Sequence, residues 1–280
     1  MTGVTSEFSI QNAQTLSPNL LSKSEAKAEL KSLKKEMASL QKMFFAEKKN
    51  ALLCVFQAMD AAGKDGTIRS VFSGFNPAGI QCSAFSKPTR PELHRDYLWR
   101  VHQRIPPKGM IGIFNRSHYE EVITVRVFPQ FLSAQSLPEL SLTERINQRF
   151  NEIRAFESLL SNSGTRILKF FLNVGKQEQF NRLLSRMENP EKNWKHDGHD
   201  LNCRDRWDDF MQAYQDAIRA TNTQNAPWYC IPADNKANMR VAVAKIIRDT
   251  LLDMTPQFPQ VDDKSRIQIV NDRNRLLGKD

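Results

Sequence analysis

The sequence predicts an α/β protein: a three-layer α/β/α fold whose central parallel sheet carries helices on both faces. Short apolar runs alternate with longer helical patterns from residue 51 to residue 254, and this alternation is typical of βαβ units. The runs are apolar at consecutive positions, as expected for strands covered on both faces. A chain of 280 residues with 40% hydrophobic and 25% charged residues is large enough to bury such a core.

The first helix is predicted over residues 24–49, after a polar segment without periodicity. Apolar residues recur in the helix at steps of three and four and mark one buried face: Leu30, Leu33, Met37, Leu40, Met43 and Phe44. Ser22 and Glu25 stand three apart, so Ser22 is expected to cap the helix in a capping box. Ser24 is the alternative cap. Lys27 would then stand three residues later, and a lysine side chain cannot accept the second hydrogen bond of a capping box. Residues 1–21 are expected to form a loose arm, 22–255 one domain and 256–280 a tail.

Five strands are predicted, at residues 51–59, 80–85, 110–115, 166–174 and 228–233. Helices are predicted at 65–75, 91–104, 118–127, 142–161, 177–187, 204–221 and 235–254, and Asp234 is expected to cap the last of them. Parallel sheets of this kind bind ligands at the carboxyl ends of their strands. The loops that follow the strands are therefore the expected place for chemistry.

Charge and composition narrow the class of partner. Lys and Arg outnumber Asp and Glu by 40 to 31, a net charge of +9, which favours an anionic partner such as a nucleotide, a phosphate polymer, nucleic acid or an acidic membrane. The alternative explanation of the positive net charge is that it only keeps the protein soluble. No apolar stretch approaches the roughly 20 residues that span a bilayer, and the N-terminal residues lack the pattern of a secretory signal. Four cysteines form no CxxC pair, and Cys54, Cys82 and Cys230 lie in predicted strands, which favours a reducing, cytoplasmic setting.

The stretch "QAMDAAGKDGT", residues 57–67, has the strand–loop–helix context of a phosphate-binding loop. Gly63 and Lys64 match that loop, but Ala58 replaces its first Gly and Asp65 its Ser or Thr. Backbone N–H groups at the following helix N-terminus offer an anion site, and Lys64 adds a positive charge. A carboxylate repels phosphate, so Asp60 is expected to hold Mg²⁺. The alternative is a Gly-containing turn with an incidental Lys.

Two further stretches place charge beside this loop. "GIFNRSHYEEV", residues 112–122, ends the third strand with Arg116 aimed toward phosphate, followed by Glu120 and Glu121. The two acids also suit a helix N-terminus, which is their simpler explanation. Residues 182–207 form a basic helical hairpin that is interpreted as a lid, or alternatively as a solvated helix pair. Its cationic residues are Arg182, Arg186, Lys192, Lys195, Arg204 and Arg206.

Four motifs together resemble one family. "QAMDAAGKDGT", "GIFNRSHYEEV", "NPEKNWK" and "APWYCIPADNK" are similar, in order and spacing, to motifs of the polyphosphate kinase 2 family, over roughly residues 25–252. The resemblance implies a P-loop kinase fold with a helical lid. It implies transfer of the terminal phosphate of inorganic polyphosphate to AMP or ADP with Mg²⁺, or with Mn²⁺, in a homodimer or homotetramer. Guanine nucleotides are further candidate acceptors. Asp65 then becomes a family feature, and Ala58 a tolerated variation.

The resemblance also assigns roles to residues. Asp60, Lys64 and Arg116 are the expected catalytic residues, with Asp60 at the metal. The expected nucleotide- and phosphate-binding positions are Ala61, Ala62, Gly63, Asp65, Gly66, Thr67, Asn115, Glu120, Glu121, Lys192 and Lys195. The expected polyphosphate channel is lined by Arg69, Lys87, Arg126, Arg182 and Arg186.

One position resembles a subgroup of that family, and several positions in the lid differ from the residues that the family usually carries. Asn115 in "FNRS", where other members carry Asp, resembles the subgroup that acts on both mono- and diphosphates. In the lid, His196 and Asp197 replace the usual Phe-Ser, and Cys203 with Arg204 replaces Glu-Arg. Asp197 therefore adds a negative charge where phosphate is expected.

Two alternatives stay open at this stage. One is an ATP-dependent nucleotide kinase of thymidylate-kinase type, and the other is a non-catalytic module that binds polyphosphate or nucleic acid. Nucleic acid is disfavoured because no interleaved aromatic platform is present, and no membrane partner is expected.

Overall fold

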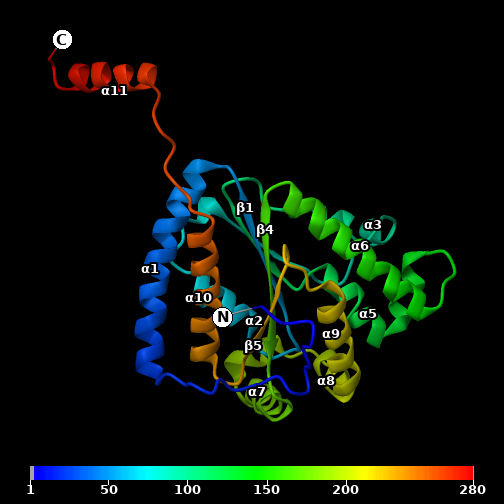
Figure 1. Ribbon diagram of the computed structural model, residues 1–280. Coiled ribbons are helices and arrows are strands. Elements are labelled where there is room, and N and C mark those ends of the chain that lie inside the picture. Colours follow the sequence, from blue (N-terminus) through cyan, green and yellow to red (C-terminus); the bar gives the residue numbers. More distant parts are fainter. Residues whose placement is uncertain (1–2, 280) are drawn as a thin grey trace.

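The fold is a five-stranded parallel sheet between two layers of helices, as the sequence predicts (Figure 1). The computed structural model describes residues 3–279. The strand order is β2-β3-β1-β4-β5 and all four pairings are parallel. The strands are β1 (Ala51–Gln57), β2 (Ile80–Ala84), β3 (Ile111–Asn115), β4 (Thr165–Asn173) and β5 (Trp228–Pro232).

The two helical layers differ in which parts of the chain they use. On one face lie α1 (Lys23–Glu47), α2 (Lys64–Phe72) and α10 (Lys236–Asp253), and on the other α5 (Thr124–Val127), α6 (Leu142–Asn162) and α9 (Trp207–Thr221) (Figure 1). At the carboxyl edge of the sheet lie α7 (Lys176–Glu188), the 3₁₀ helix η5 (Pro190–Lys195) and α8 (His199–Asp205). Strand β1 is central and buried at every position, because both layers cover it.

Helix α1 follows its predicted pattern closely. Leu33, Met37, Leu40 and Phe44 are buried, and Leu30 and Met43 are partly buried against the core. The Ser22 hydroxyl accepts from the N–H of Glu25 and the Glu25 carboxylate accepts from the N–H of Ser22. The predicted capping box is therefore confirmed, and Ser22 rather than Ser24 is the cap.

Helix boundaries in the polar connections were predicted less well. The single helix expected at 91–104 is two short helices, α3 (Arg90–Leu93) and α4 (Trp99–His102). The helix expected at 118–127 is a 3₁₀ turn, η2 (His118–Glu121), followed by α5. The prediction of Asp234 as the cap of α10 is wrong: Asn235 accepts from the N–H groups of Ala237 and Asn238. Asp234 instead accepts from the N–H of Gly175, at the start of α7.

The segment before α1 is irregular, but it is not the loose arm that was expected. The N–H of Val4 donates to the carbonyl oxygen of Trp228 on β5. The Gln215 side chain on α9 bonds the backbone of Phe8 and of Ile10, and the Ile10 side chain is buried. These contacts cover the outer edge of β5, which would otherwise be an unprotected sheet edge. The tail, by contrast, contains a helix that was not predicted, α11 (Asp263–Leu276), which buries no residue and projects from the body (Figure 1).

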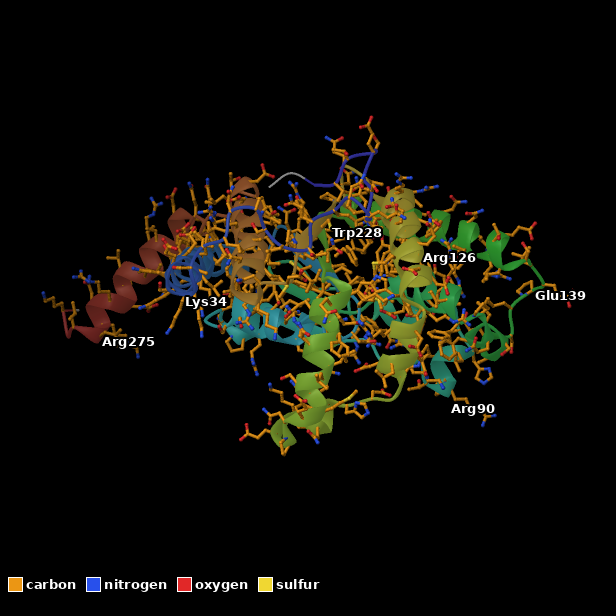
Figure 2. All side chains as sticks on the ribbon, turned by 90° about the horizontal axis from the view of Figure 1, so that it is seen from below. Lys34, Arg90, Arg126, Glu139, Trp228 and Arg275 are labelled. Atoms are coloured by element: carbon orange, nitrogen blue, oxygen red, sulfur yellow. The ribbon has the colours of Figure 1, made fainter. Side chains whose placement is uncertain are left out.

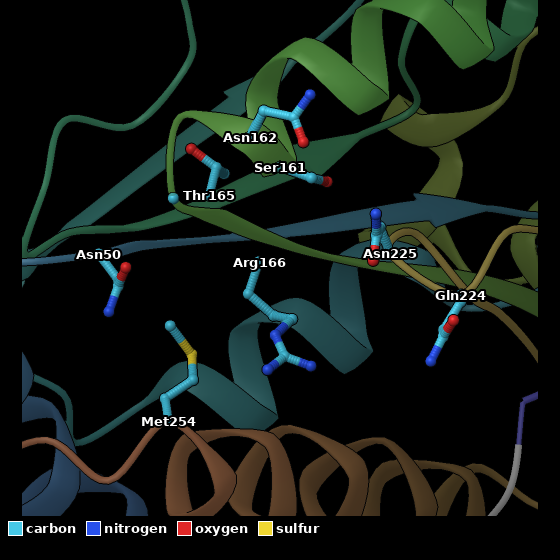
Figure 3. Close-up of a pocket in the computed structure, with 9 residues that line it drawn as sticks. Asn50, Ser161, Asn162, Thr165, Arg166, Gln224, Asn225 and Met254 are labelled. Carbon is cyan, nitrogen blue, oxygen red and sulfur yellow. The ribbon is translucent and has the colours of Figure 1, made fainter.

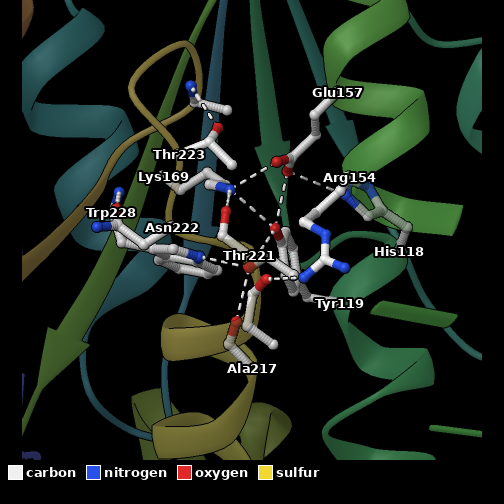
Figure 4. A network of polar contacts seen from close by, with 12 residues as sticks. His118, Tyr119, Arg154, Glu157, Lys169, Ala217, Thr221, Asn222, Thr223 and Trp228 are labelled. Carbon is white, nitrogen blue, oxygen red and sulfur yellow. Dashed lines mark hydrogen bonds and ion pairs between the residues drawn. The ribbon is translucent and has the colours of Figure 1, made fainter. Parts of the chain in front are cut away.

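A polar cluster lies inside the core between β4, α6 and α9 (Figure 4). The Lys169 ammonium on β4 donates to the Glu157 carboxylate at 2.6 Å, to the Tyr119 hydroxyl at 3.0 Å and to the carbonyl oxygen of Thr221 at 2.8 Å. The Trp228 indole N–H donates to the Thr221 hydroxyl. Lys169 is fully buried, so its charge depends on these partners.

None of the helices within residues 3–279 combines the length and the apolar character required to cross a membrane. The cysteines are free thiols, but only one of the three predicted strand cysteines is buried as expected. Cys54 is buried, Cys230 is half-buried and Cys82 is exposed, because β2 is an edge strand.

Candidate active site

A tight loop joins the carboxyl end of β1 to α2, where the phosphate-binding motif was predicted. Gly63 has φ of 103° and Ala61 has φ of 61°, so the chain turns through two left-handed positions before the helix begins. Ala58, which stands in place of the usual first Gly, is not left-handed and its side chain is 7% exposed. A Cβ therefore fits there, which explains why the loop tolerates Ala.

Helix α7 and the loop lysine hold the carbonyl side of this loop. Gln179 donates to the carbonyl oxygen of Asp60, and Arg182 to those of Ala61 and Ala62. The Lys64 ammonium donates to the carbonyl oxygen of Ala58 at 2.7 Å. Burial lowers the pKa of Lys64, while the nearby Asp60 carboxylate opposes that shift. A charge held this way is poised for an anion, because phosphate offers it a stronger partner than a carbonyl group.

Arg116 meets Asp60 across the end of the sheet. Its guanidinium donates to the Asp60 carboxylate at 2.6 Å. Its backbone has φ of 60°, and its N–H donates to the carbonyl oxygen of Phe56, which fixes the turn after β3 onto β1. Burial acts to lower the pKa of Arg116, but the carboxylates of Glu120 and Asp60 outweigh it and raise that pKa. Arg116 is therefore a permanent cation beside the loop.

Asn115, at the last position of β3, contacts the first turn of α2. Its amide donates to the Asp65 carboxylate at 2.7 Å. The contact orients Asp65, which stands where a Ser or Thr is usual, toward the neighbouring strand. Asn115 and Asp65 thus form a pair, and no pattern in the sequence indicates their contact.

The loop opens into a cleft of about 850 Å³ that is bounded on its far side by α7, η5 and α8. Arg186 of α7 forms an ion pair with Asp200 of α8 and donates to the carbonyl oxygen of Lys195. These contacts hold α7, η5 and α8 together beside the cleft, and the interpretation of this hairpin as a lid stays a prediction. Asp197 lines the cleft and accepts from the N–H of His199, the first residue of α8.

The cleft also contains two cations at the start of α10, Lys236 and Arg240, for which the sequence gives only a weak indication of ligand binding. Burial lowers the pKa of both, and neighbouring cations add to the shift: Arg182 for Lys236 and Arg69 for Arg240. Gly66 makes room for Arg240, since a Cβ there would lie 3.3 Å from its guanidinium. Their positions shortly after the strand end that carries Asp234 were the signal available in the sequence.

Comparison with known proteins identifies the family of this chain. A sequence model of the family described as polyphosphate kinase 2 matches residues 20–259. The chain belongs to the polyphosphate kinase 2 family.

Named relatives and a solved structure extend over most of the chain. The AMP/ADP-polyphosphate phosphotransferase of Meiothermus ruber is 46% identical over 233 residues, which cover 83% of this chain and 84% of the relative. The ADP-polyphosphate phosphotransferase of Rhodopseudomonas palustris is 42% identical over 243 residues, 86% of this chain and 84% of the relative. The crystal structure of polyphosphate kinase 2 from Arthrobacter aurescens has a TM-score of 0.88 at 36% identity and covers 96% of this chain and 95% of its own.

Within this family fold, most of the predicted site residues do meet in one cleft. Those that line it are Asp60, Ala61, Gly63, Lys64, Asp65, Gly66, Asn115, Arg116, Arg182, Arg186, Lys192 and Lys195. Ala62 and Thr67 are buried behind the loop, and the Thr67 hydroxyl donates to the carbonyl oxygen of Gly63. Their contribution is to the shape of the loop.

Three other predicted site residues do not line the cleft and contact side chains within the fold instead. Glu121 forms a buried ion pair with Arg149 at 2.8 Å and ends the 3₁₀ helix η2, so it neither lines the cleft nor stabilises a helix N-terminus. Glu120 accepts from Gln57 and Thr124 and lies behind Arg116. Arg126, predicted to line the polyphosphate channel, instead pairs with Asp216 on α9, and Figure 2 shows it beside that helix.

The remaining channel residues also differ from the prediction. Arg69 and Lys87 are exposed and lie outside the residues that line the cleft. Arg182 lines the cleft, but its guanidinium donates to the carbonyl oxygens of Ala61, Ala62, Ala233 and Asp234 and pairs with Glu178. All its N–H groups are thus engaged within the fold. Arg182 braces the loop, and Lys236 and Arg240 are the better candidates for contact with polyphosphate.

A divalent metal fits the loop only as a metal shared with substrate. In the described part of the chain no three His, Cys, Asp or Glu side chains gather into a metal site. Mg²⁺ usually takes one or two carboxylates and completes its shell with phosphate oxygens and water. Asp60 supplies one such carboxylate, partly exposed to the cleft and already adjacent to Arg116.

A second pocket, of about 500 Å³, lies at the opposite, amino-terminal edge of the sheet (Figure 3). It is lined mainly by neutral side chains such as Asn50, Asn162 and Gln224. Its one cation, Arg166, is paired with Asp253. It therefore lacks the free positive charge that a phosphate polymer requires.

Proposed function

We propose that this protein transfers the terminal phosphate of inorganic polyphosphate to AMP and to ADP. The observation that carries the proposal is the juxtaposition of the Lys64 loop and the Asp60–Arg116 pair with a cleft rich in cations. Membership of the polyphosphate kinase 2 family and the phosphotransferase activities for which its relatives are named support it.

In the proposed reaction a phosphate oxygen of the acceptor attacks the terminal phosphorus of polyphosphate. The new P–O bond extends the nucleotide by one phosphate, and the broken P–O bond leaves polyphosphate one unit shorter. Phosphoryl transfer depends mainly on positioning and on neutralising charge. Lys64 and Arg116 supply fixed positive charge at the transferred group, and the lid cations Lys192 and Lys195 hold the substrates and exclude water.

We propose Mg²⁺ as the cofactor, with Mn²⁺ as a substitute, held by Asp60. Asp60 would hold the metal, which would add positive charge at the phosphates beyond that of Lys64 and Arg116. Asp60 and Arg116 are adjacent, so metal and guanidinium would act on the same phosphate.

Asn115 supports both AMP and ADP as acceptors. A carboxylate at this position would face Asp65 and repel the incoming phosphate, whereas the amide donates to Asp65 and adds no charge. We propose that a negative charge at this position would lower the use of AMP more than the use of ADP.

Three further properties belong to the same proposal. The protein would act in the cytoplasm, where AMP and ADP are available. It would work as a homodimer or homotetramer, as the family resemblance implies. Guanine nucleotides would be accepted alongside adenine nucleotides.

The deciding experiment is a comparison of phosphate donors. Purified protein is incubated with Mg²⁺ and with AMP or ADP, using polyphosphate or ATP as the donor, and products are separated by ion-exchange chromatography. Polyphosphate should support formation of ADP and ATP. Turnover with ATP alone would favour a thymidylate-kinase-type enzyme. Salt-sensitive binding of polyphosphate without turnover, in protein shown to be folded, would favour a binding module.

A further inference from the structure

Trp194 is an exposed tryptophan in the middle of the lid. It lies in η5, lines the cleft and is 78% exposed. The other tryptophans are shielded: Trp207 and Trp228 are buried and Trp99 is half-buried. Exposing a large apolar ring to water costs free energy. The exposure of Trp194 therefore indicates that a ligand or partner covers the ring.

The neighbours of Trp194 do not supply that cover. The Lys195 ammonium lies 4.9 Å from the centre of the ring, a cation–π contact on one face. Lys192 and Lys195 are three apart in a 3₁₀ helix, so they share one side of it, and Trp194 projects from another. The second face of the indole is therefore left for a flat partner.

The two proposed substrates differ in whether they could use this ring. Polyphosphate carries only charged oxygens and has no flat apolar face, whereas a nucleotide carries a base that stacks on aromatic side chains. Among the described residues that line the cleft, the other large aromatic is Phe85, which is buried and covered by the Arg100 guanidinium. Trp194 is thus the aromatic surface there that a base can reach.

We propose that Trp194 recognises the acceptor nucleotide by stacking its indole on the nucleobase, while Lys192 and Lys195 bind the phosphates next to it. The identity of the acceptor rests on the proposed function. Stacking reads the face of a base and not its edge, so it selects nucleotides over simple phosphates without selecting strongly among bases. The proposal therefore predicts similar affinities for AMP and GMP.

The test measures binding without polyphosphate, by titration calorimetry, for AMP and for ribose 5-phosphate, which lacks the base. Trp194→Ala should weaken AMP binding by roughly 5- to 100-fold and leave ribose 5-phosphate binding unchanged. Trp194→Phe keeps a ring and should retain most of the AMP affinity. Equal loss for both ligands, or no loss for either, would overturn the proposal.

Phe258→Ala is the matched control. Phe258 is an exposed aromatic with a lysine ammonium, that of Lys42, over its ring, but it lies outside the cleft. Its removal should change neither titration. The KM for polyphosphate in Trp194→Ala should also stay at the wild-type value, which shows that the lid is intact.

The two proposals can fail separately. Wild-type binding of AMP that depends on Trp194, without transfer from polyphosphate, would remove the proposed reaction and keep the role of Trp194. Normal turnover by Trp194→Ala with an unchanged KM for AMP would remove the role of Trp194 and keep the proposed reaction.

Discussion

Two clusters of positive charge in this protein are built in opposite ways. The Lys169 cluster lies in the core, and every donor of its ammonium group has a partner: Glu157, Tyr119 and the carbonyl group of Thr221. The cleft cations Lys192, Lys236 and Arg240 have no carboxylate within 4.0 Å among residues 3–279, and the Arg240 Nε is buried without a hydrogen bond. A paired buried charge is costly to separate from its partner, whereas an unpaired one is available to a ligand.

The two clusters are nevertheless connected through one short segment. Tyr119, whose hydroxyl lies in the buried cluster, follows Arg116 by three residues in the turn after β3. Fixing Tyr119 therefore fixes the backbone that carries Arg116, which is held at a positive φ. The buried charges act at a distance by shaping the site, and the cleft charges act on the substrate itself.

The largest expected effect on stability comes from breaking the buried pair. Lys169→Met leaves the Glu157 carboxylate buried without its cation and should destabilise the fold by about 3–5 kcal/mol. Urea unfolding measures this change. Adding Glu157→Gln should recover part of the loss. Glu29→Gln, which breaks the exposed pair with Lys245, is the control and should change stability by less than about 1 kcal/mol.

Substitution of Lys64 tests whether a cation in the cleft acts on the substrate. Lys64→Ala should lower kcat by about 100- to 1000-fold, because charge on the transferred phosphate loses a fixed donor. Turnover with polyphosphate, Mg²⁺ and ADP measures it, alongside thermal unfolding to show that the fold is retained. A rate within a few-fold of wild type would contradict the role given to Lys64.

Arg240→Ala separates substrate binding from stability. The KM for polyphosphate should rise by about tenfold, a typical loss for one charge-assisted contact. The unfolding free energy should stay unchanged or increase, because Arg240 has no carboxylate partner. Arg248→Ala is the control on the same helix: Arg248 pairs with Glu36 outside the cleft, and its loss should leave the KM unchanged.

A carboxylate added to the cleft should have a smaller and selective effect. Asn115→Asp places a second negative charge beside Asp65 and should lower kcat/KM for AMP several-fold more than for ADP. Initial rates with each acceptor, at saturating polyphosphate, provide the ratio. An unchanged ratio would refute the role proposed for Asn115.

The smallest effect is a difference in acid sensitivity. Burial acts to raise the pKa of Glu157, but Lys169 and His118 outweigh it and hold that pKa below 4.5. Between the two values the unfolded chain binds more protons, so this contribution to stability is full above about pH 4.5 and is lost as the pH falls. Urea midpoints from pH 5 to pH 3 should therefore drop more steeply for wild type than for Glu157→Gln. Parallel slopes would show that Glu157 is not held in this way.

Sequence alone determined the parallel sheet, the phosphate loop, the lid and the family, because these depend on local patterns: consecutive apolar runs, a Gly-Lys turn after a strand, and basic residues around a helix break. It also indicated Asp60, Lys64 and Arg116, since residues at strand ends share one edge of a parallel sheet.

Only the tertiary structure decided which charges are free. Arg182 and Lys236 look alike in the sequence, yet Arg182 is engaged by four carbonyl groups and Lys236 faces the cleft. Arg126 forms an ion pair with Asp216, and Glu121 forms one with Arg149, so neither side chain lines the cleft. The physical reason is that a charge is available to a ligand only when no partner within the fold reaches it, and those partners come from distant parts of the chain.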